Sequence, residues 1–277
     1  MHRTKTFMLM VLLTVVVIIL GGAIAGEQGM IMAFGFALVL NFFSYWYSDK
    51  IAIKMTRSRP LKEEEAPEVY EMVRNLTNRA RLPMPDIYLT PSNQPNAFAA
   101  GRNPSNATIA LTKGIMNLLD KDELEGVIAH ELSHVKNRDT LISTIAAVMA
   151  GALAFLARMG RFRMLFGGRR GRNKGGALLQ LVAIIFAPLA AILIRMAISR
   201  SREYLADSTG AEIAGNPEGL ASALQKMQSR VQRNPMKVNE ATSHMFILNP
   251  LSGRGMTKLF STHPPVAERI KKLRQRR

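Results

Sequence analysis

The chain of 277 residues carries 37 Lys and Arg against 20 Asp and Glu, which gives a formal net charge of +17, and it contains no cysteine. The absence of cysteine excludes a disulfide framework, a thiolate metal site and a thiol nucleophile. A charge this positive is typical of proteins that bind nucleic acid or anionic lipid. The distribution of the apolar residues decides between these two partners.

Four segments lack any charged residue: 7–26, 30–48, 141–157 and 175–194. A helix that spans a bilayer needs roughly 20 mostly apolar residues and tolerates about 17 to 25. The first two segments meet this requirement, the third is at its short limit, and the fourth contains Pro188, which kinks a helix. The sequence therefore predicts an integral membrane protein that begins with a hairpin of two transmembrane helices in residues 1–48.

A cleaved signal peptide is the alternative interpretation of the first segment. Arg3 and Lys5 resemble a basic leader, and residues 23–25 (Ala-Ile-Ala) imitate a cleavage site. However, the apolar run is longer than the usual hydrophobic region of a signal peptide, and a second apolar run follows after three residues. This arrangement favours the membrane hairpin.

Basic residues predict the orientation of this hairpin. Arg3 and Lys5 precede it, only Glu27 lies in its turn, and four basic residues follow it within residues 50–59. Because Lys and Arg favour the cytoplasmic side of a membrane, both ends of the hairpin are expected in the cytoplasm.

Residues 141–198 form a second hydrophobic hairpin, whose loop (158–174) holds seven basic residues and no acidic one. If both apolar segments cross the membrane, this loop lies outside, against the charge rule. Partial or re-entrant insertion keeps the loop cytoplasmic and is the favoured alternative. With either path, the chain returns to the side on which it entered.

The polar segments 49–140 and 199–277 are expected to form one catalytic domain, which the second hairpin interrupts. Apolar spacing predicts a helix over residues 67–81, and Asp120 with Glu123 forms a capping box that starts another helix. Short strands are predicted within this segment at residues 86–90, 96–100 and 107–111. This order indicates an α+β domain with a small mixed sheet.

The strongest chemical signal is the run His130-Glu131-Leu132-Ser133-His134. Positions i and i+4 share one face of a helix, so two imidazoles can bind one metal ion. Neutral imidazole suits Zn²⁺, and Glu131 is placed to take a proton from a metal-activated water. The alternative is an amphipathic helix whose histidines are exposed or hydrogen-bonded internally.

A catalytic zinc site needs a third protein ligand and one open position. Glu203 and Asp207, in the run Ser-Arg-Glu-Tyr-Leu-Ala-Asp, are again i and i+4 on one helical face. Glu203 is a candidate ligand, and Asp207 is a candidate partner for the second nitrogen of a ligand histidine. An ordinary solvated helix face is the alternative for this segment.

These motifs, in this order, resemble the HtpX/CAAX prenyl protease family of membrane zinc metallopeptidases. Residues 95–99 (Pro-Asn-Ala-Phe-Ala) and 261–265 (Ser-Thr-His-Pro-Pro) extend the resemblance over nearly the whole chain. The resemblance implies a zincin-like (gluzincin) catalytic domain with one Zn²⁺ per chain. It makes His130, His134 and Glu203 the zinc ligands.

The resemblance also implies roles for further residues. Glu131 is the general base, and Asp207 is the acidic residue that supports a ligand. Asn96, Ala97 and Phe98 lie on the strand that pairs with an extended substrate. His263, held by Arg269, stabilises the oxyanion, and a turn histidine before Pro-Pro is the alternative interpretation of His263.

The function implied is hydrolysis of misfolded or damaged membrane proteins at the cytoplasmic side of the cell inner membrane, in stress-related quality control. Substrates would be membrane proteins or unfolded polypeptides. If the helix of the histidines continues from His134 to Leu141, the site lies roughly 10 Å from the hydrophobic boundary. The alternatives are processing of prenylated CAAX proteins and a non-enzymatic membrane scaffold that binds anionic lipid.

Two clusters hold most of the net charge, the loop 158–174 with +7 and the tail 268–277 with +5. Neither cluster contains a predicted zinc ligand, and no ladder of aromatic residues accompanies them. They are interpreted as anchors for anionic membrane lipids. No specific nucleic acid partner is expected.

Overall fold

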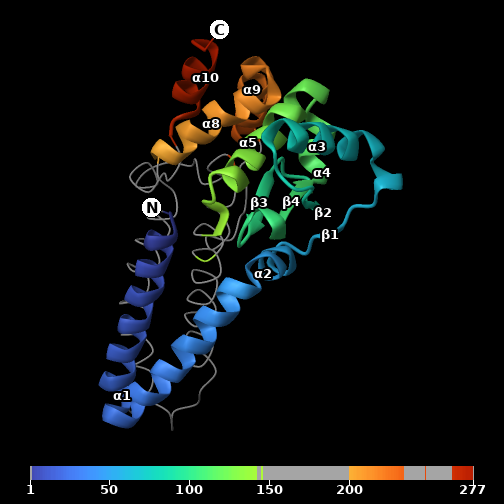
Figure 1. Ribbon diagram of the computed structural model, residues 1–277. Coiled ribbons are helices and arrows are strands. Elements are labelled where there is room, and N and C mark those ends of the chain that lie inside the picture. The colour runs from blue at the N-terminus through green and yellow to red at the C-terminus, as the bar shows by residue number, and fades with distance from the viewer. Residues whose placement is uncertain (1, 142–144, 146–199, 234–246, 248–263, 277) are drawn as a thin grey trace.

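The computed structural model describes residues 2–141, 145, 200–233, 247 and 264–276 (Figure 1). The basic loop 158–174, nearly all of the second hydrophobic hairpin and His263 lie outside these residues. The topological predictions for residues 142–198 therefore stay predictions.

Helix α1 (His2–Trp46) reverses direction at Gly26, whose φ of +62° lies in the left-handed region. Figure 1 shows the resulting hairpin, with a first arm before Gly26 and a second arm that leads back to α2 and the strands. The Asn41 side-chain amide donates a hydrogen bond of 2.8 Å to the Thr14 hydroxyl, which joins the two arms. Gly26–Trp46 is the one helix, within the described residues, that is long and apolar enough to cross a membrane.

The sheet has four strands in the order β1-β2-β4-β3. Strand β2 (Asp86–Thr90) pairs with β4 (Ala107–Thr112) in parallel, and the pairs of β2 with β1 (Arg59–Pro60) and of β4 with β3 (Ala97–Gly101) are antiparallel. The predicted mixed sheet is thus confirmed. Strand β3 lies at an edge, and none of the strands among the described residues pairs with its outer side.

Helices cover both faces of this sheet. On one face, apolar residues of α3 (Pro67–Ala80), α5 (Lys121–Lys136) and α9 (Pro217–Arg233) share a core with the strands. On the other face, α2 (Ser48–Met55) places Ala52 against Phe98, Ala100 and Ala110. Figure 1 shows α2 between α1 and the strands, so the sheet is attached directly to the end of the α1 hairpin. Short connections complete this part: η1 (Glu63–Glu65), η2 (Pro104–Asn106) and α4 (Lys113–Leu118).

Helix α5 starts as predicted and ends earlier than predicted. The Asp120 carboxylate accepts from the Glu123 amide, and the Glu123 side chain accepts from the Asp120 amide, which completes the capping box. The helix ends at Lys136, and Arg138 takes a left-handed φ of 58°. The expectation that this helix continues to Leu141 is therefore wrong, because the chain turns at residues 137–139.

Helices α8 (Arg200–Ala214) and α9 lie close against α5 because glycines stand where they meet. A Cβ on Gly210 of α8 would lie 2.9 Å from the Cα and the nitrogen of His130. A Cβ on Gly126 of α5 would meet the backbone of Gly219 and Leu220 of α9. Helix α10 (Val266–Arg274) then packs on α8 and α9 and brings Arg269 into the interior, where it is 0% exposed.

Candidate metal centre

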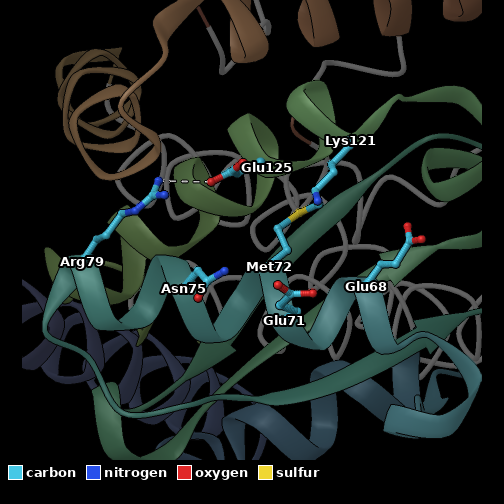
Figure 2. Close-up of a pocket in the computed structure, with 7 residues that line it drawn as sticks. All are labelled: Glu68, Glu71, Met72, Asn75, Arg79, Lys121 and Glu125. Carbon is cyan, nitrogen blue, oxygen red and sulfur yellow. Dashed lines mark hydrogen bonds and ion pairs between the residues drawn. The ribbon is translucent and has the colours of Figure 1, made fainter.

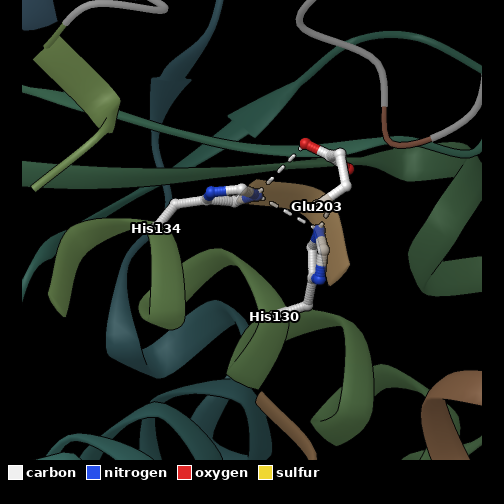
Figure 3. Close-up of side chains that lie close together, drawn as sticks. All are labelled: His130, His134 and Glu203. Carbon is white, nitrogen blue, oxygen red and sulfur yellow. Dashed lines mark hydrogen bonds and ion pairs between the residues drawn. The ribbon is translucent and has the colours of Figure 1, made fainter. Parts of the chain in front are cut away.

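Two histidines of α5 and one glutamate of α8 converge on one point (Figure 3). The Nε2 atoms of His130 and His134 are 3.2 Å apart. The Glu203 carboxylate oxygens lie 3.9 Å from His130 Nε2 and 3.8 Å from His134 Nε2. His130 is 1% exposed and Glu203 is 6% exposed, whereas the His134 side chain is 18% exposed, so the site is mostly buried but reaches solvent beside His134.

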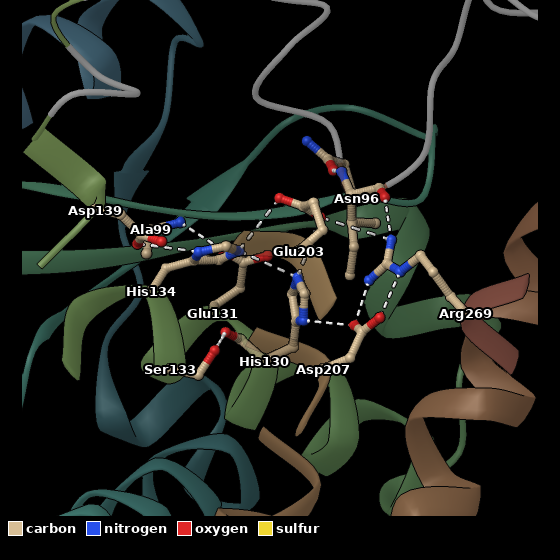
Figure 4. A network of polar contacts seen from close by, with 11 residues as sticks. Asn96, Ala99, His130, Glu131, Ser133, His134, Asp139, Glu203, Asp207 and Arg269 are labelled. Atoms are coloured by element: carbon tan, nitrogen blue, oxygen red, sulfur yellow. Dashed lines mark hydrogen bonds and ion pairs between the residues drawn. The ribbon is translucent and has the colours of Figure 1, made fainter. Parts of the chain in front are cut away.

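His130 is held in place from the side opposite to His134. Its Nδ1 lies 3.0 Å from the Asp207 carboxylate. Asp207 in turn accepts two hydrogen bonds from the Arg269 guanidinium, at 2.9 and 2.7 Å. A third Arg269 donor binds the Ile247 carbonyl at 3.0 Å, and Figure 4 shows this network around the histidines.

His134 has a carboxylate partner of its own, which the sequence interpretation did not identify. Its Nδ1 lies 3.1 Å from Asp139, which is 2% exposed and belongs to the turn after α5. The next residue, Thr140, donates a hydrogen bond of 3.1 Å to the Gly101 carbonyl at the end of β3. A signal was present in the sequence, because an acidic residue five positions after the second histidine follows a polar Asn-Arg pair.

The donor set fits a metal ion. The Nδ1 atoms of His130 and His134 lie 3.0 and 3.1 Å from the carboxylates of Asp207 and Asp139, so in their neutral forms both rings present Nε2 lone pairs to each other and to Glu203. Converging lone pairs repel one another unless a cation lies between them. Ligands of a tetrahedral ion with bonds of about 2.0–2.1 Å lie roughly 3.3 Å apart, which matches the 3.2 Å between the two Nε2 atoms, and the Glu203 oxygens lie about 0.5 Å farther from them than this.

The electrostatics of the site also favour positive charge. Burial acts to lower the pKa of His134, but Asp139, followed by Glu203 and Glu131, outweighs burial and raises this pKa to about 10. The carboxylates therefore make this point attractive to a proton or a metal ion.

Asp207 and Arg269 form a buried ion pair beside the histidines. Burial acts to raise the pKa of Asp207, and the Arg269 charge with the hydrogen bond to His130 lowers it to about 2. The pKa of Arg269 is raised in return. Burial acts to lower it, but the charge of Asp207 and its hydrogen bonds with Arg269 outweigh this effect. Asp207 is thus a fixed negative charge at all ordinary pH values.

Glu131 lies between the histidines and the edge strand (Figure 4). Its Oε2 accepts a hydrogen bond of 2.9 Å from the Ala99 amide of β3. The side chain is buried, and this desolvation raises the pKa of Glu131, an effect that the neighbouring histidines oppose. A carboxylate whose pKa is raised in this way, next to a candidate metal-binding set, is better suited to accept a proton than a solvent-exposed glutamate.

Two of the predicted substrate residues, Ala97 and Phe98, lie on β3, the strand whose Ala99 amide binds Glu131, and Asn96 directly precedes this strand. Ala97 packs in the core behind the sheet, and Phe98 packs toward α2, so only their backbone can serve an extended substrate. The Asn96 amide oxygen accepts a hydrogen bond of 3.0 Å from the Ile247 amide. The contact of Asn96 with a substrate stays a prediction, as does the pairing of Arg269 with His263, which lies outside the described residues.

A separate hollow lies between α3 and the start of α5 (Figure 2). Its charged lining includes the ion pair of Arg79 with Glu125, at 3.2 Å. Seven residues line it: Glu68, Glu71, Met72, Asn75, Arg79, Lys121 and Glu125. None of them is a predicted site residue, so we place the chemistry at the histidines instead.

The fold and the site together define a metallopeptidase. The profile of Peptidase family M48 matches residues 63–277. A Protease HtpX homolog of Pelotomaculum thermopropionicum is 53% identical over 278 residues, which covers 99% of this chain and 98% of that relative. A Protease HtpX homolog of Pyrococcus furiosus is 51% identical over 273 residues, which covers 98% of this chain and 94% of the relative. The chain belongs to peptidase family M48.

A solved structure shares the fold. The crystal structure of S. mikatae Ste24p superposes with a TM-score of 0.54 at 18% sequence identity and covers 94% of this chain. The chain spans 62% of the length of that protein, less than two thirds. At this identity the likeness supports the fold alone.

Proposed function

We propose that this metallopeptidase is a zinc-dependent endopeptidase whose ion is held by His130, His134 and Glu203, one ion per chain. The observation that carries the proposal is the convergence of two Nε2 atoms and one carboxylate, all within 4.8 Å of one another. Two imidazoles with one carboxylate suit zinc, and three protein ligands leave one position open for chemistry. A bound zinc ion supplies Lewis acidity, which polarises a peptide carbonyl and acidifies water.

The protein side of the reaction follows from the groups around the ion. Glu131 takes a proton from the attacking water at its carboxylate and delivers it to the leaving nitrogen of the cleaved peptide bond. Its raised pKa suits both transfers. Asp207 and Asp139 keep the Nδ1 protons on the two histidines and so keep the Nε2 lone pairs directed at the ion.

The substrate is proposed to bind as an extended chain along β3. The outer edge of this strand lies beside Glu131, and pairing through backbone groups requires little side-chain recognition. Asn96 is proposed to contact the substrate backbone. His263, supported by Arg269, is proposed to stabilise the oxyanion, a contribution of about 10²–10³ in rate for such a donor.

The membrane arrangement is part of the same proposal. Both arms of α1 cross the cell inner membrane, and the catalytic domain, formed by 49–140 and 199–277, faces the cytoplasm. The second hairpin, residues 141–198, inserts partly, and the basic clusters bind anionic lipid. The substrates are misfolded or damaged membrane proteins. The similarity of this chain to relatives named Protease HtpX homolog supports this role.

The substitution Glu131→Gln tests the chemistry, with Glu125→Gln as the matched control on the same helix. The first variant should lose about 10²–10⁴ in cleavage of an unfolded casein substrate while retaining one zinc per chain. The control changes Glu125, which forms a partly exposed ion pair with Arg79 away from the histidines, and it should keep both properties. Unchanged cleavage by the Glu131→Gln variant would refute the role of Glu131. Cleavage restricted to prenylated substrates would support the CAAX alternative instead.

A further inference from the structure

One end of the edge strand β3 meets two membrane-proximal points of the chain. Arg102 directly follows β3, and its Nη1 donates a hydrogen bond of 3.2 Å to the carbonyl of Trp46, the last residue of α1. The Arg102 guanidinium also lies 4.6 Å from the centre of the Trp46 ring. Beside it, the Gly101 carbonyl accepts from Thr140, which immediately precedes the apolar segment 141–157.

The end of α1 has the aromatic residues that are typical of a membrane–water boundary. Phe42, Phe43, Trp46 and Tyr47 form a chain of ring contacts there, with centroids 5.5–6.1 Å apart. Trp and Tyr gather at the headgroup level of bilayers because one end of each ring is apolar and the other polar. Trp46 is 46% exposed, so its ring is accessible to lipid while its carbonyl holds Arg102.

The distance from this boundary to the catalytic carboxylate is short and fixed. Glu131 binds the Ala99 amide, three residues before Arg102. At about 3.3 Å per residue of extended chain, Glu131 therefore acts roughly 10 Å from the level of Trp46. The strand has little freedom to move, because Ala52 of α2 is 0% exposed against the underside of β3 and β4.

We propose that β3, held to α1 by Arg102 and Trp46, sets the distance between the bilayer surface and the bond that is cut. A membrane-anchored substrate enters at the Gly101 end and is cleaved about three extended residues beyond its last membrane-embedded residue. Arg102 is thus a positioning residue that determines specificity for anchored substrates. This inference rests on the proposed function and adds a selection rule to it.

The test uses the full-length protein in phospholipid vesicles. The substrates are an apolar spanning helix joined to a flexible linker of zero to twelve residues and a cleavable segment. One series places the helix before the linker and the other places it after the linker. Both are needed because a substrate can pair with β3 in the parallel or the antiparallel direction and still enter at the Gly101 end. A soluble fluorogenic peptide with the same cleavable segment measures catalysis without an anchor. Mass spectrometry locates the cut.

The wild-type protein should cut anchored substrates first at about three residues from the anchor, and linkers shorter than this should be cut roughly tenfold or more slowly. Arg102→Ala should spread the cut positions and slow the anchored substrates, while the soluble peptide is cleaved at an unchanged rate. Trp46→Leu, which keeps the carbonyl and removes the ring, should also spread the cut positions and slow the anchored substrates. This variant tests the inference if the Arg102→Ala variant is unstable. Arg74→Ala, which breaks an exposed ion pair with Glu63, is the control and should change neither.

Identical cut positions in the wild-type protein and in the Arg102 and Trp46 variants would overturn the inference, as would wild-type cuts at random distances from the anchor. Failure of the wild-type protein to cleave the soluble peptide would instead overturn the proposed function. The two failures are therefore distinguishable.

Discussion

Gly210 is the point at which α8 touches the backbone of the first candidate ligand. An alanine Cβ at this position would lie 2.9 Å from the His130 Cα and nitrogen and 3.2 Å from the Ala129 carbonyl carbon. Ordinary van der Waals contact begins near 3.4 Å, and these neighbours are backbone atoms that cannot rotate away. Gly210→Ala must therefore move α8 by about 0.5 Å relative to α5.

This displacement reaches the metal centre because Glu203 is on the same helix, two turns before Gly210. Metal–ligand distances tolerate only about 0.2 Å, so the shift should lower zinc affinity by about 10- to 100-fold. Overpacking should also lower the free energy of unfolding by about 1–3 kcal/mol, from which the better helix propensity of alanine recovers up to about 1 kcal/mol.

Gly126→Ala supplies the matched control. Its Cβ would meet the backbone of Gly219 and Leu220 in α9, which carries none of the candidate ligands. Because this Cβ would lie 2.4 Å from the Leu220 nitrogen, a closer approach than at Gly210, the variant should lose at least as much stability, and it should keep its zinc affinity within a factor of a few. Competition with a chromophoric chelator measures affinity, and thermal unfolding of the metal-free protein in detergent measures stability. Equal zinc affinities for the two variants would refute the argument that Gly210 sets the position of Glu203.

Other predictions concern the carboxylates behind the histidines. Arg269→Met should cost about 3–5 kcal/mol in unfolding free energy because it leaves Asp207 buried and unpaired, whereas Arg274→Met, which breaks an exposed pair on the same helix, should cost less than about 1 kcal/mol. The Asp207 pKa of about 2 lies below its unfolded value of about 3.9. The stabilisation that the Asp207 charge gives the folded protein is therefore complete above pH ~4 and is lost as the pH falls toward 2. The unfolding free energies of the wild-type protein and the Arg269→Met variant should thus converge in acid. Denaturation measured at pH 7 and at pH 3 checks both statements, and a constant difference would contradict them. Asp139→Asn should lower zinc affinity about 10- to 100-fold in a folded protein, and unchanged chelator competition would show that Asp139 does not orient His134.

The parts of the site that lie on one helix were predictable because their geometry is local. The i, i+4 spacing of His130 and His134 fixes one face of a helix wherever that helix packs, and the Asp120 capping box acts within a single turn. The strands of the mixed sheet were also recognisable, since turn residues separate short apolar runs. The contribution of Glu203 depends on a contact between helices distant in sequence, and the resemblance to known peptidases supplied it.

Contacts between elements distant in the chain could not be predicted from the sequence, for a physical reason. Closing α8 on His130 requires a glycine at 210, yet the sequence does not reveal which helix this glycine faces. The partner of Asn96 is the Ile247 backbone, and a backbone group has no signature in the sequence. In both cases the residue type was visible and its partner was not.

The turn after α5 shows most clearly how one local error changes a conclusion. Periodicity favours a helix that runs from the histidines toward Leu141, but Arg138 adopts a left-handed φ of 58° and the helix ends. That break lets Asp139 fold back onto His134 and lets Thr140 reach Gly101, contacts that a continuous helix would forbid. The height of the site above the membrane therefore cannot be measured along α5. It is set by the edge strand, whose far end is fixed to Trp46, and this is why the distance of the cut from the bilayer should depend on Arg102.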